Sequence, residues 1–262
     1  MASLTLAGEA ANYTEHLKII VGSERKTYIV HKEFILPHSP VLTEHYNQCC
    51  EFFETNTIEI PNVSDYESMQ VLLNWCYKPN TALVQPAVDP DAGGDKANNT
   101  RRTQLLQVYN LARDFGMARL KNHITNQFRE HSEPRVMTIA LINYSATFKN
   151  PECGPVRYIV DNVARYLNKH PKRYHEQQSA WSRQFKTMLR ADVALLQAVH
   201  DAQMRLAAEQ VSPKHKPLCF YHDHAADDEC PDAEAQSEDE DTEDESMDDE
   251  PLANTSRKKQ KK

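Results

Sequence analysis

Four residues near the C-terminus have the types and the close spacing that could bind a metal ion. Cys219, His222, His224 and Cys230 fall within the run PLCFYHDHAADDEC. Two thiolates and two imidazoles are a ligand set that suits tetrahedral zinc. The spacing matches no standard zinc finger, however, and His222 and His224 need an irregular backbone to reach one ion. Two interpretations stay open: a zinc site, or a disordered linker that carries Cys and His without a metal.

An acidic run follows this cluster and contains three candidate phosphorylation sites. Ser237, Thr242 and Ser246 each have an acidic residue three positions later. An acid-directed kinase of the casein-kinase-II type would accept this pattern, and the added phosphate would deepen the local negative charge. The alternative is that the acidic residues only keep the segment extended and solvated.

The last residues of the sequence form a compact basic cluster. Its members are Arg257, Lys258, Lys259, Lys261 and Lys262. Such a cluster resembles a monopartite nuclear import signal, and an exposed terminus suits receptor binding. We expect the protein in the nucleus, with the cytoplasm as a second location. The competing interpretation is an incidental Lys-rich end.

The remaining residues do not form a recognisable catalytic set. His31 lies at an expected strand-to-helix turn and has no Asp, Ser or Cys partner at a familiar spacing, which favours structural packing. No G-x-S-x-G, P-loop or H-E-x-x-H motif occurs, and the six glycines leave little for a phosphate cradle. We therefore expect no enzyme activity and no cofactor other than the zinc considered above.

The net charge of −8 comes from one region. Residues 223–250 hold 16 Asp and Glu and no Lys or Arg, whereas residues 1–222 hold 25 basic and 22 acidic residues. The acidic run is too charged and too poor in apolar residues to fold alone, so we expect a disordered tail. No apolar run reaches the length of a membrane span, and no direct nucleic-acid binding is expected. The sparse cysteines favour reduced thiols in an intracellular protein.

The first half of the chain combines short strands with helices. Alternating apolar residues predict a strand pair in LKIIV and KTYIVH, joined by a turn at Gly22–Arg25. A short helix that Pro37 ends is expected next, then a helix capped by Ser39, and a strand at TIEI. Ser64 and Glu67 have capping-box spacing ahead of the helical stripe Met69, Leu72, Leu73 and Cys76.

The second half shows helical periodicity only. Pro and Gly residues predict a long loop at 78–103, and apolar stripes predict helices from Leu105 to about His131. Ser132–Pro134 marks a boundary, beyond which further helices are expected up to about residue 211. The predicted organisation is a leader at 1–13, a mixed domain at 14–131, a helical segment at 132–211, and a tail at 212–262.

The order of these motifs resembles a BTB/POZ domain over residues 14–131. The residues that carry the resemblance are Val30, His31, Lys32, Leu36, Ser39, Pro40, Ile60, Pro61, Leu72, Tyr77, Leu111, Ala112, Phe115, Gly116 and Leu120. The resemblance implies an α+β fold of short strands with clustered helices, used to bind proteins and to self-associate. A BTB domain followed by a helical segment and a charged tail, without kelch or zinc-finger repeats, resembles fungal BTB-domain proteins.

We therefore expect a protein-interaction module that works as a homodimer and bridges partners in nuclear transcription or chromatin regulation. The leader, with Leu4 and Leu6, would contribute to the two-fold interface. Two alternatives remain. The protein could be a substrate adaptor for a cullin-based ubiquitin ligase, which the resemblance also implies. It could instead be an acidic-tail chaperone of basic nuclear proteins, in which the folded part only dimerises.

Overall fold

A small sheet stands at one end of the molecule. The computed structural model describes residues 15–53, 55–79, 83, 94–130, 153–172, 180–209 and 211–223. Strand β1 (His16–Val21) is central, with β2 (Lys26–His31) antiparallel on one side and β3 (Thr57–Ile60) parallel on the other. The predicted strands are confirmed. The pairing of β3 with β1 was not apparent from the sequence, because no local turn links the two strands.

The hairpin turn between β1 and β2 requires glycine. Gly22 has a φ of 70°, and a Cβ atom there would lie 2.4 Å from the carbonyl oxygen of Val63. The backbone N–H of Gly22 donates to the carbonyl of Ile60, 2.8 Å away. Only glycine combines this left-handed conformation with so close an approach. The turn thereby fixes the ends of β1 and β3 together.

Three helices pack with the sheet: α1 (Lys32–Ile35), α2 (Pro40–Phe53) and α3 (Tyr66–Tyr77). The short 3₁₀ helix η1 (Leu36–His38), which contains Pro37, lies between α1 and α2. Ser39 caps α2 as predicted: its Oγ accepts from the N–H of Leu42 at 3.1 Å and donates to the carbonyl of Phe115 at 2.6 Å. The capping-box prediction at Ser64 was one residue early. Asp65 caps α3, and its Oδ1 accepts from the N–H of Ser68 at 3.0 Å.

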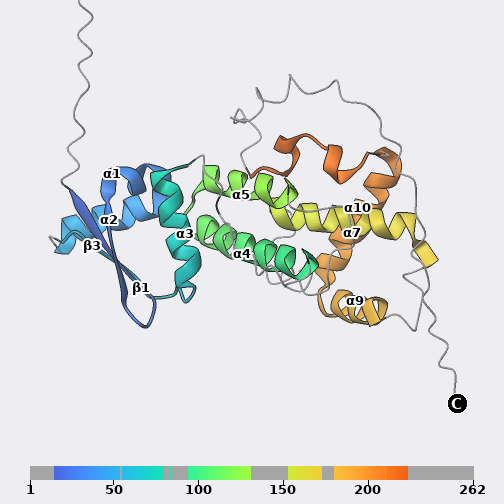
Figure 1. Cartoon of the computed structure of the whole chain (residues 1–262), viewed down its shortest axis with the longest axis horizontal. Coiled ribbons are helices and arrows are strands. Elements are labelled where there is room, and N and C mark those ends of the chain that lie inside the picture. Colours follow the sequence, from blue (N-terminus) through green and yellow to red (C-terminus); the bar gives the residue numbers. More distant parts are fainter. Residues whose placement is uncertain are drawn as a thin grey trace, which may run out of the picture.

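Helices α4 (Gly94–Asp114) and α5 (Ala118–Glu130) lie beside each other and link the sheet end to the rest of the chain (Figure 1). The expected loop 78–103 is therefore wrong at its second end, because residues 94–103 are helical. The apolar stripe begins only at Leu105, so the polar first turns of α4 gave no periodic signal. Gly116, with a φ of 68°, separates the two helices as its position predicted.

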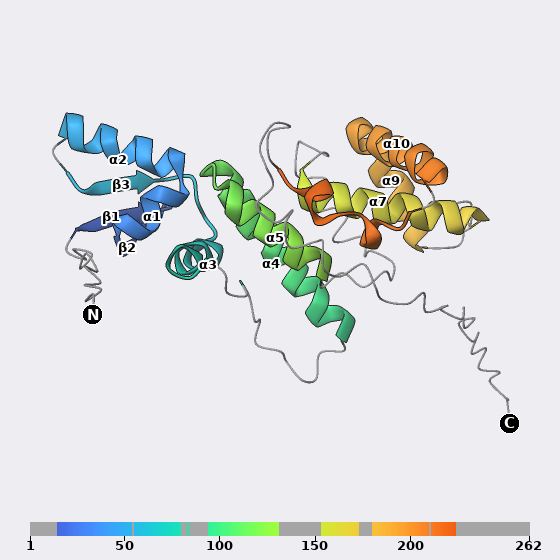
Figure 2. The ribbon, with the colours of Figure 1, turned by 90° about the horizontal axis from the view of Figure 1, so that it is seen from above.

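Helices α7 (Gly154–Lys169), α9 (Ala180–Ala191) and α10 (Val193–Glu209) form the other end of the molecule, as Figures 1 and 2 show. Helix α7 packs on α5 and also contacts α10, which in turn contacts α9. Helix α7, beyond the boundary, thus packs directly on the domain that precedes it. Residues 132–152 and 173–179 of the expected helical segment lie outside the described residues.

Buried apolar residues form one continuous core from the sheet to α10. Fully buried side chains include Leu17 and Ile19 of β1, Leu72 of α3 and Phe128 of α5. No helix in the described part of the chain has both the length and the apolar character of a membrane span.

Candidate interaction surfaces

The sheet end presents exposed backbone edges and exposed apolar side chains. Among the described residues, neither β2 nor β3 has a second neighbouring strand. Ile29 on β2 is 71% exposed, and Phe52 and Phe53 at the end of α2 are 68% and 73% exposed. Unpaired strand edges beside apolar side chains are the features that favour pairing with another chain. We call β2, β3 and these three residues the sheet-end surface.

His31 belongs to an aromatic cluster beside this surface. Its backbone N–H donates to Tyr77 Oη at 2.8 Å, and its Nδ1 lies 3.1 Å from the same oxygen. The rings of His16, Phe34 and Tyr77 also surround it. These contacts join β2 to the last residue of α3, in agreement with the structural role predicted for His31.

Residues 211–223 fold back across α5 and α7, and we call them the strap. The strap contains the 3₁₀ helices η2 (Pro213–His215) and η3 (Leu218–Tyr221). Pro213, Tyr221 and His222 are buried. The expectation that the tail begins at 212 is therefore corrected: residues 212–223 belong to the folded part. Their apolar and aromatic residues are too few and too irregular to produce a helical or strand period.

Arg129 of α5 binds the backbone of the strap. Its guanidinium donates to the carbonyl oxygens of Lys214, Lys216 and Pro217 at 3.2, 2.7 and 3.3 Å. The same group lies 5.0 Å from the ring centre of Tyr221, a cation–π contact. Burial lowers the pKa of this arginine, with the nearby tyrosines acting in the opposite direction. One buried cation thus satisfies three carbonyl groups of a segment that is distant in sequence.

A second buried contact links the strap to α7 and α10. Asp161, whose side chain is 1% exposed, accepts from Arg205 at 2.5 Å and from Tyr221 Oη at 2.8 Å. Burial raises the pKa of Asp161, while the hydrogen bonds from Tyr221 and Arg205 oppose the shift. Burial also raises the pKa of Tyr221, which keeps its hydroxyl a donor. The arrangement connects three separate elements through one carboxylate.

The end of the strap forms hydrogen bonds with the first turn of α7 and with α4 and α5. Asp223 accepts a hydrogen bond from Tyr109 and another from the N–H of Gly154 at 3.3 Å. Its own N–H donates to Asn122 Oδ1 at 3.0 Å. Beside it, burial raises the pKa of the Cys153 thiol to about 11, so this thiol is protonated at neutral pH. These contacts join the strap to three helices of the folded part.

The structure describes only part of the predicted metal cluster. Cys219 is half-buried in η3, and His222 is buried with its Nε2 2.8 Å from Asn126 Oδ1. His224 and Cys230 lie outside the described residues, so zinc binding stays a prediction. Within the described part of the chain, no group of three potential ligands is assembled. The phosphorylation residues Ser237, Thr242 and Ser246 and the basic cluster at 257–262 also lie outside it.

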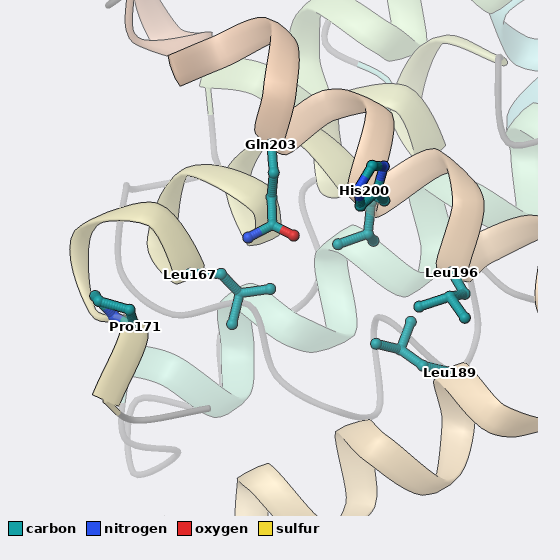
Figure 3. Close-up of a pocket in the computed structure, with 7 residues that line it drawn as sticks. Leu167, Pro171, Leu189, Leu196, His200 and Gln203 are labelled. Atoms are coloured by element: carbon teal, nitrogen blue, oxygen red, sulfur yellow. The ribbon is translucent and has the colours of Figure 1, made fainter. Parts of the chain in front are cut away.

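An apolar cleft of about 230 Å³ opens at the far end from the sheet. It lies among the end of α7, the end of α9 and the middle of α10. Figure 3 shows Leu167 on one side of the cleft and Leu189 and Leu196 on the other. The full lining is Leu167, Pro171, Leu189, Leu196, Val199, His200 and Gln203. The sequence predicted helices in this region but could not show that they leave a space between them.

Comparison with known families identifies the first half of the chain. Residues 12–132 match the family model of the BTB/POZ domain. The matched range contains the whole sheet and α1 to α5. This part of the chain is therefore a BTB/POZ domain, with the α+β fold that its motifs predicted. BTB/POZ domains mediate protein–protein interactions and are not an enzyme family. No curated protein and no solved structure matches the chain.

Proposed function

We propose that this protein is a self-associating BTB/POZ scaffold that pairs through the sheet-end surface and presents its helical end to other proteins. The observation that supports the proposal most is the exposure of Ile29, Phe52 and Phe53 beside the two open strand edges. An open strand edge beside exposed apolar side chains can pair with a strand of another chain. A second copy bound there would pair with an open edge and cover the exposed apolar side chains.

A closed pair with two-fold symmetry is the simplest arrangement. Such a pair buries the same surface on both copies and is closed by its symmetry, so this contact does not extend into a filament. A stable interface removes roughly 1,200–2,000 Å² of surface from water. The residues before His16 adjoin β1, so the leader with Leu4 and Leu6 is placed in the sequence to contribute to it. The proposed site of action is the nucleus, on the basis of the basic cluster at 257–262.

Sedimentation equilibrium of the full chain tests the pairing. Ile29→Lys places a charge on an edge strand and should shift the association at micromolar concentration at least tenfold toward monomer. Val193→Lys is a matched control, because Val193 is 73% exposed on α10 at the other end. If wild type sediments as a monomer, or if both variants weaken association equally, the sheet-end pairing is refuted.

A cullin-adaptor role is a second candidate, and the direct packing of α7 on α5 favours it. This packing extends the domain with a rigid helical surface, which a large scaffold protein could contact together with the domain. A pull-down with purified cullin proteins separates the two proposals. Retention of the full chain, abolished by a Lys169→Glu change at the exposed end of α7 but not by Ile29→Lys, would support the adaptor role.

A further inference from the structure

The apolar cleft at the helical end is open to solvent and preformed. Its lining residue Leu196 is 43% exposed. At the rim, Asn168 Nδ2 of α7 donates to the carbonyl of Gln203 on α10 at 3.0 Å, and Gln203 Nε2 donates to Asn168 Oδ1 at 3.3 Å. The volume of about 230 Å³ is below the roughly 300–1,000 Å³ of small-molecule sites. The cleft therefore fits a single apolar side chain better than a cofactor or metabolite.

An exposed methionine stands beside this cleft on the same helix. Met204 is 65% exposed, although it follows the lining residue Gln203 directly. It lies one turn after His200, another lining residue, and so on the same face of α10. Because its side chain extends into solvent, Met204 does not fill the cleft of its own chain. Methionine is unbranched and flexible, which suits an apolar space of irregular shape.

We propose that a second copy of this chain binds at the cleft, with Met204 of each copy inserted into the cleft of the other. A two-fold axis near residue 202 makes the two α10 helices cross antiparallel and places Met204 of each copy opposite His200 of the other. The same symmetry operation forms both insertions at once, so one short surface is complementary to itself. We call this contact the α10 crossing.

The residues around Met204 suit such a crossing. Ala207 and Ala208 are exposed and small, so they allow the partner helix to approach closely. Asp201 lies about 100° around the helix from His200 and therefore away from the crossing point. Its carboxylate already accepts from Gln197 Nε2 at 2.7 Å and lies 3.5 Å from His200 Nδ1. An apolar centre with hydrogen-bonded polar groups at its margin is the usual composition of a protein interface.

The α10 crossing is a small contact at the end of the molecule opposite the sheet-end surface (Figure 1). Two helices that touch over about two turns bury less than the roughly 1,200 Å² of a stable interface, so the association is weak. One chain can form both contacts at once, and the crossing therefore links sheet-end pairs into larger assemblies when their local concentration rises. At lower concentration the helical end stays available to other proteins.

Sedimentation equilibrium of the full chain that carries Ile29→Lys tests the proposal without the sheet-end pairing. A reversible dimer should form in the range of roughly 0.1–1 mM. Adding Met204→Ser should weaken it at least about tenfold, because the apolar contact is lost from both clefts. Val193→Ser is the matched control: Val193 is 73% exposed on α10 but lies nine residues, or roughly 13 Å, from the axis and outside the crossing.

A mixing experiment tests the reciprocal insertion itself. Leu196→Lys places a charge in the cleft but keeps Met204, whereas Met204→Ser keeps the cleft. Each variant alone should fail to pair. A mixture of the two retains one insertion of the two, so it should associate more strongly than either variant alone. Far-UV circular dichroism verifies that both variants fold, as expected for substitutions at exposed positions.

Three outcomes would overturn the proposal. The first is a monomer of the Ile29→Lys chain throughout the concentration range. The second is an equal effect of Met204→Ser and Val193→Ser. The third is a mixture that associates no better than its components. Failure of the sheet-end pairing gives a different result, because wild type and Ile29→Lys would then associate equally while Met204→Ser still removed the association.

Discussion

The sheet and the strap of this molecule are stabilised by different kinds of contact. At the sheet end, aliphatic side chains such as Leu17, Ile19 and Leu72 are removed from water and need no particular partner. Around the strap, buried Arg129 and Asp161 are held by hydrogen bonds to groups far away in the sequence. An aliphatic core tolerates small changes, whereas a buried charge depends on each partner. The comparison predicts where single substitutions will do the most damage.

The largest expected effect is loss of the carboxylate of Asp161. Asp161→Ala leaves Arg205 and the buried hydroxyl of Tyr221 without their shared acceptor. We expect the free energy of unfolding to fall by about 3 kcal/mol, near the lower end for a broken buried pair because Arg205 is 30% exposed. Urea denaturation followed by circular dichroism measures it. Asp201→Ala, at an exposed carboxylate, is the control, and an equal loss there would contradict the contrast.

A smaller loss is expected from the buried cap at the sheet end. Ser39→Ala removes both the cap of α2 and the donor to the carbonyl of Phe115. The expected decrease is about 1–2 kcal/mol, since a neutral hydroxyl leaves a smaller penalty than a charge. The same denaturation experiment applies, with Ser23→Ala in the exposed turn as control. A decrease larger than that of Asp161→Ala would reverse the ranking of the two ends.

The pH dependence of stability should report on the protonation of the same carboxylate, that of Asp161. Because burial raises the folded pKa of Asp161 above its ordinary value of 3.8, the native state binds this proton more tightly than the unfolded chain. Its favourable contribution is complete below pH 3.8 and is lost as the pH rises through the folded pKa. Wild type should therefore lose stability relative to Asp161→Asn as the pH increases across this window. A relative gain would contradict the direction of the shift.

The smallest effect is expected at the exposed ion pair of the sheet. Arg25 donates to Glu59 at 2.7 Å, but their side chains are 63% and 56% exposed. The hydrogen bond from Arg25 lowers the pKa of Glu59, yet solvent and salt screen such a pair. Glu59→Gln should leave the denaturation midpoint unchanged within error. A measurable decrease that disappears in high salt would show that this surface pair matters more than its exposure suggests.

The predictability of each region follows from the range of its contacts. The strands, the Ser39 cap and the α3 stripe depend on residues a few positions apart, so periodicity and capping rules found them. The strap depends on pairs such as Arg129 with Lys216, which have no fixed spacing in sequence. The dense proline and aromatic content of PKHKPLCFYHD was the one available signal that this stretch differs from the acidic run after it.

The first turns of α4 and the cleft were missed for related reasons. Polar helical turns lack an apolar stripe, and a space between helices is a property of their relative placement rather than of any one of them. The family resemblance supplied the fold of residues 14–131 but gave no information on residues 153–223. The packing of residues 153–223 is evident only in the structure.

The late position of the strap has a consequence for how the protein is made on the ribosome. The elements of the BTB/POZ domain are complete in sequence at Glu130, but Asp161 and Arg129 acquire their strap partners only when residues 214–221 have been translated. At about 5–20 residues per second, that interval lasts on the order of 5–20 s. During this interval the nascent chain contains the complete BTB/POZ domain and a second part that still lacks its contacts with the strap. Chaperones that bind incomplete chains therefore have their opportunity at the helical end.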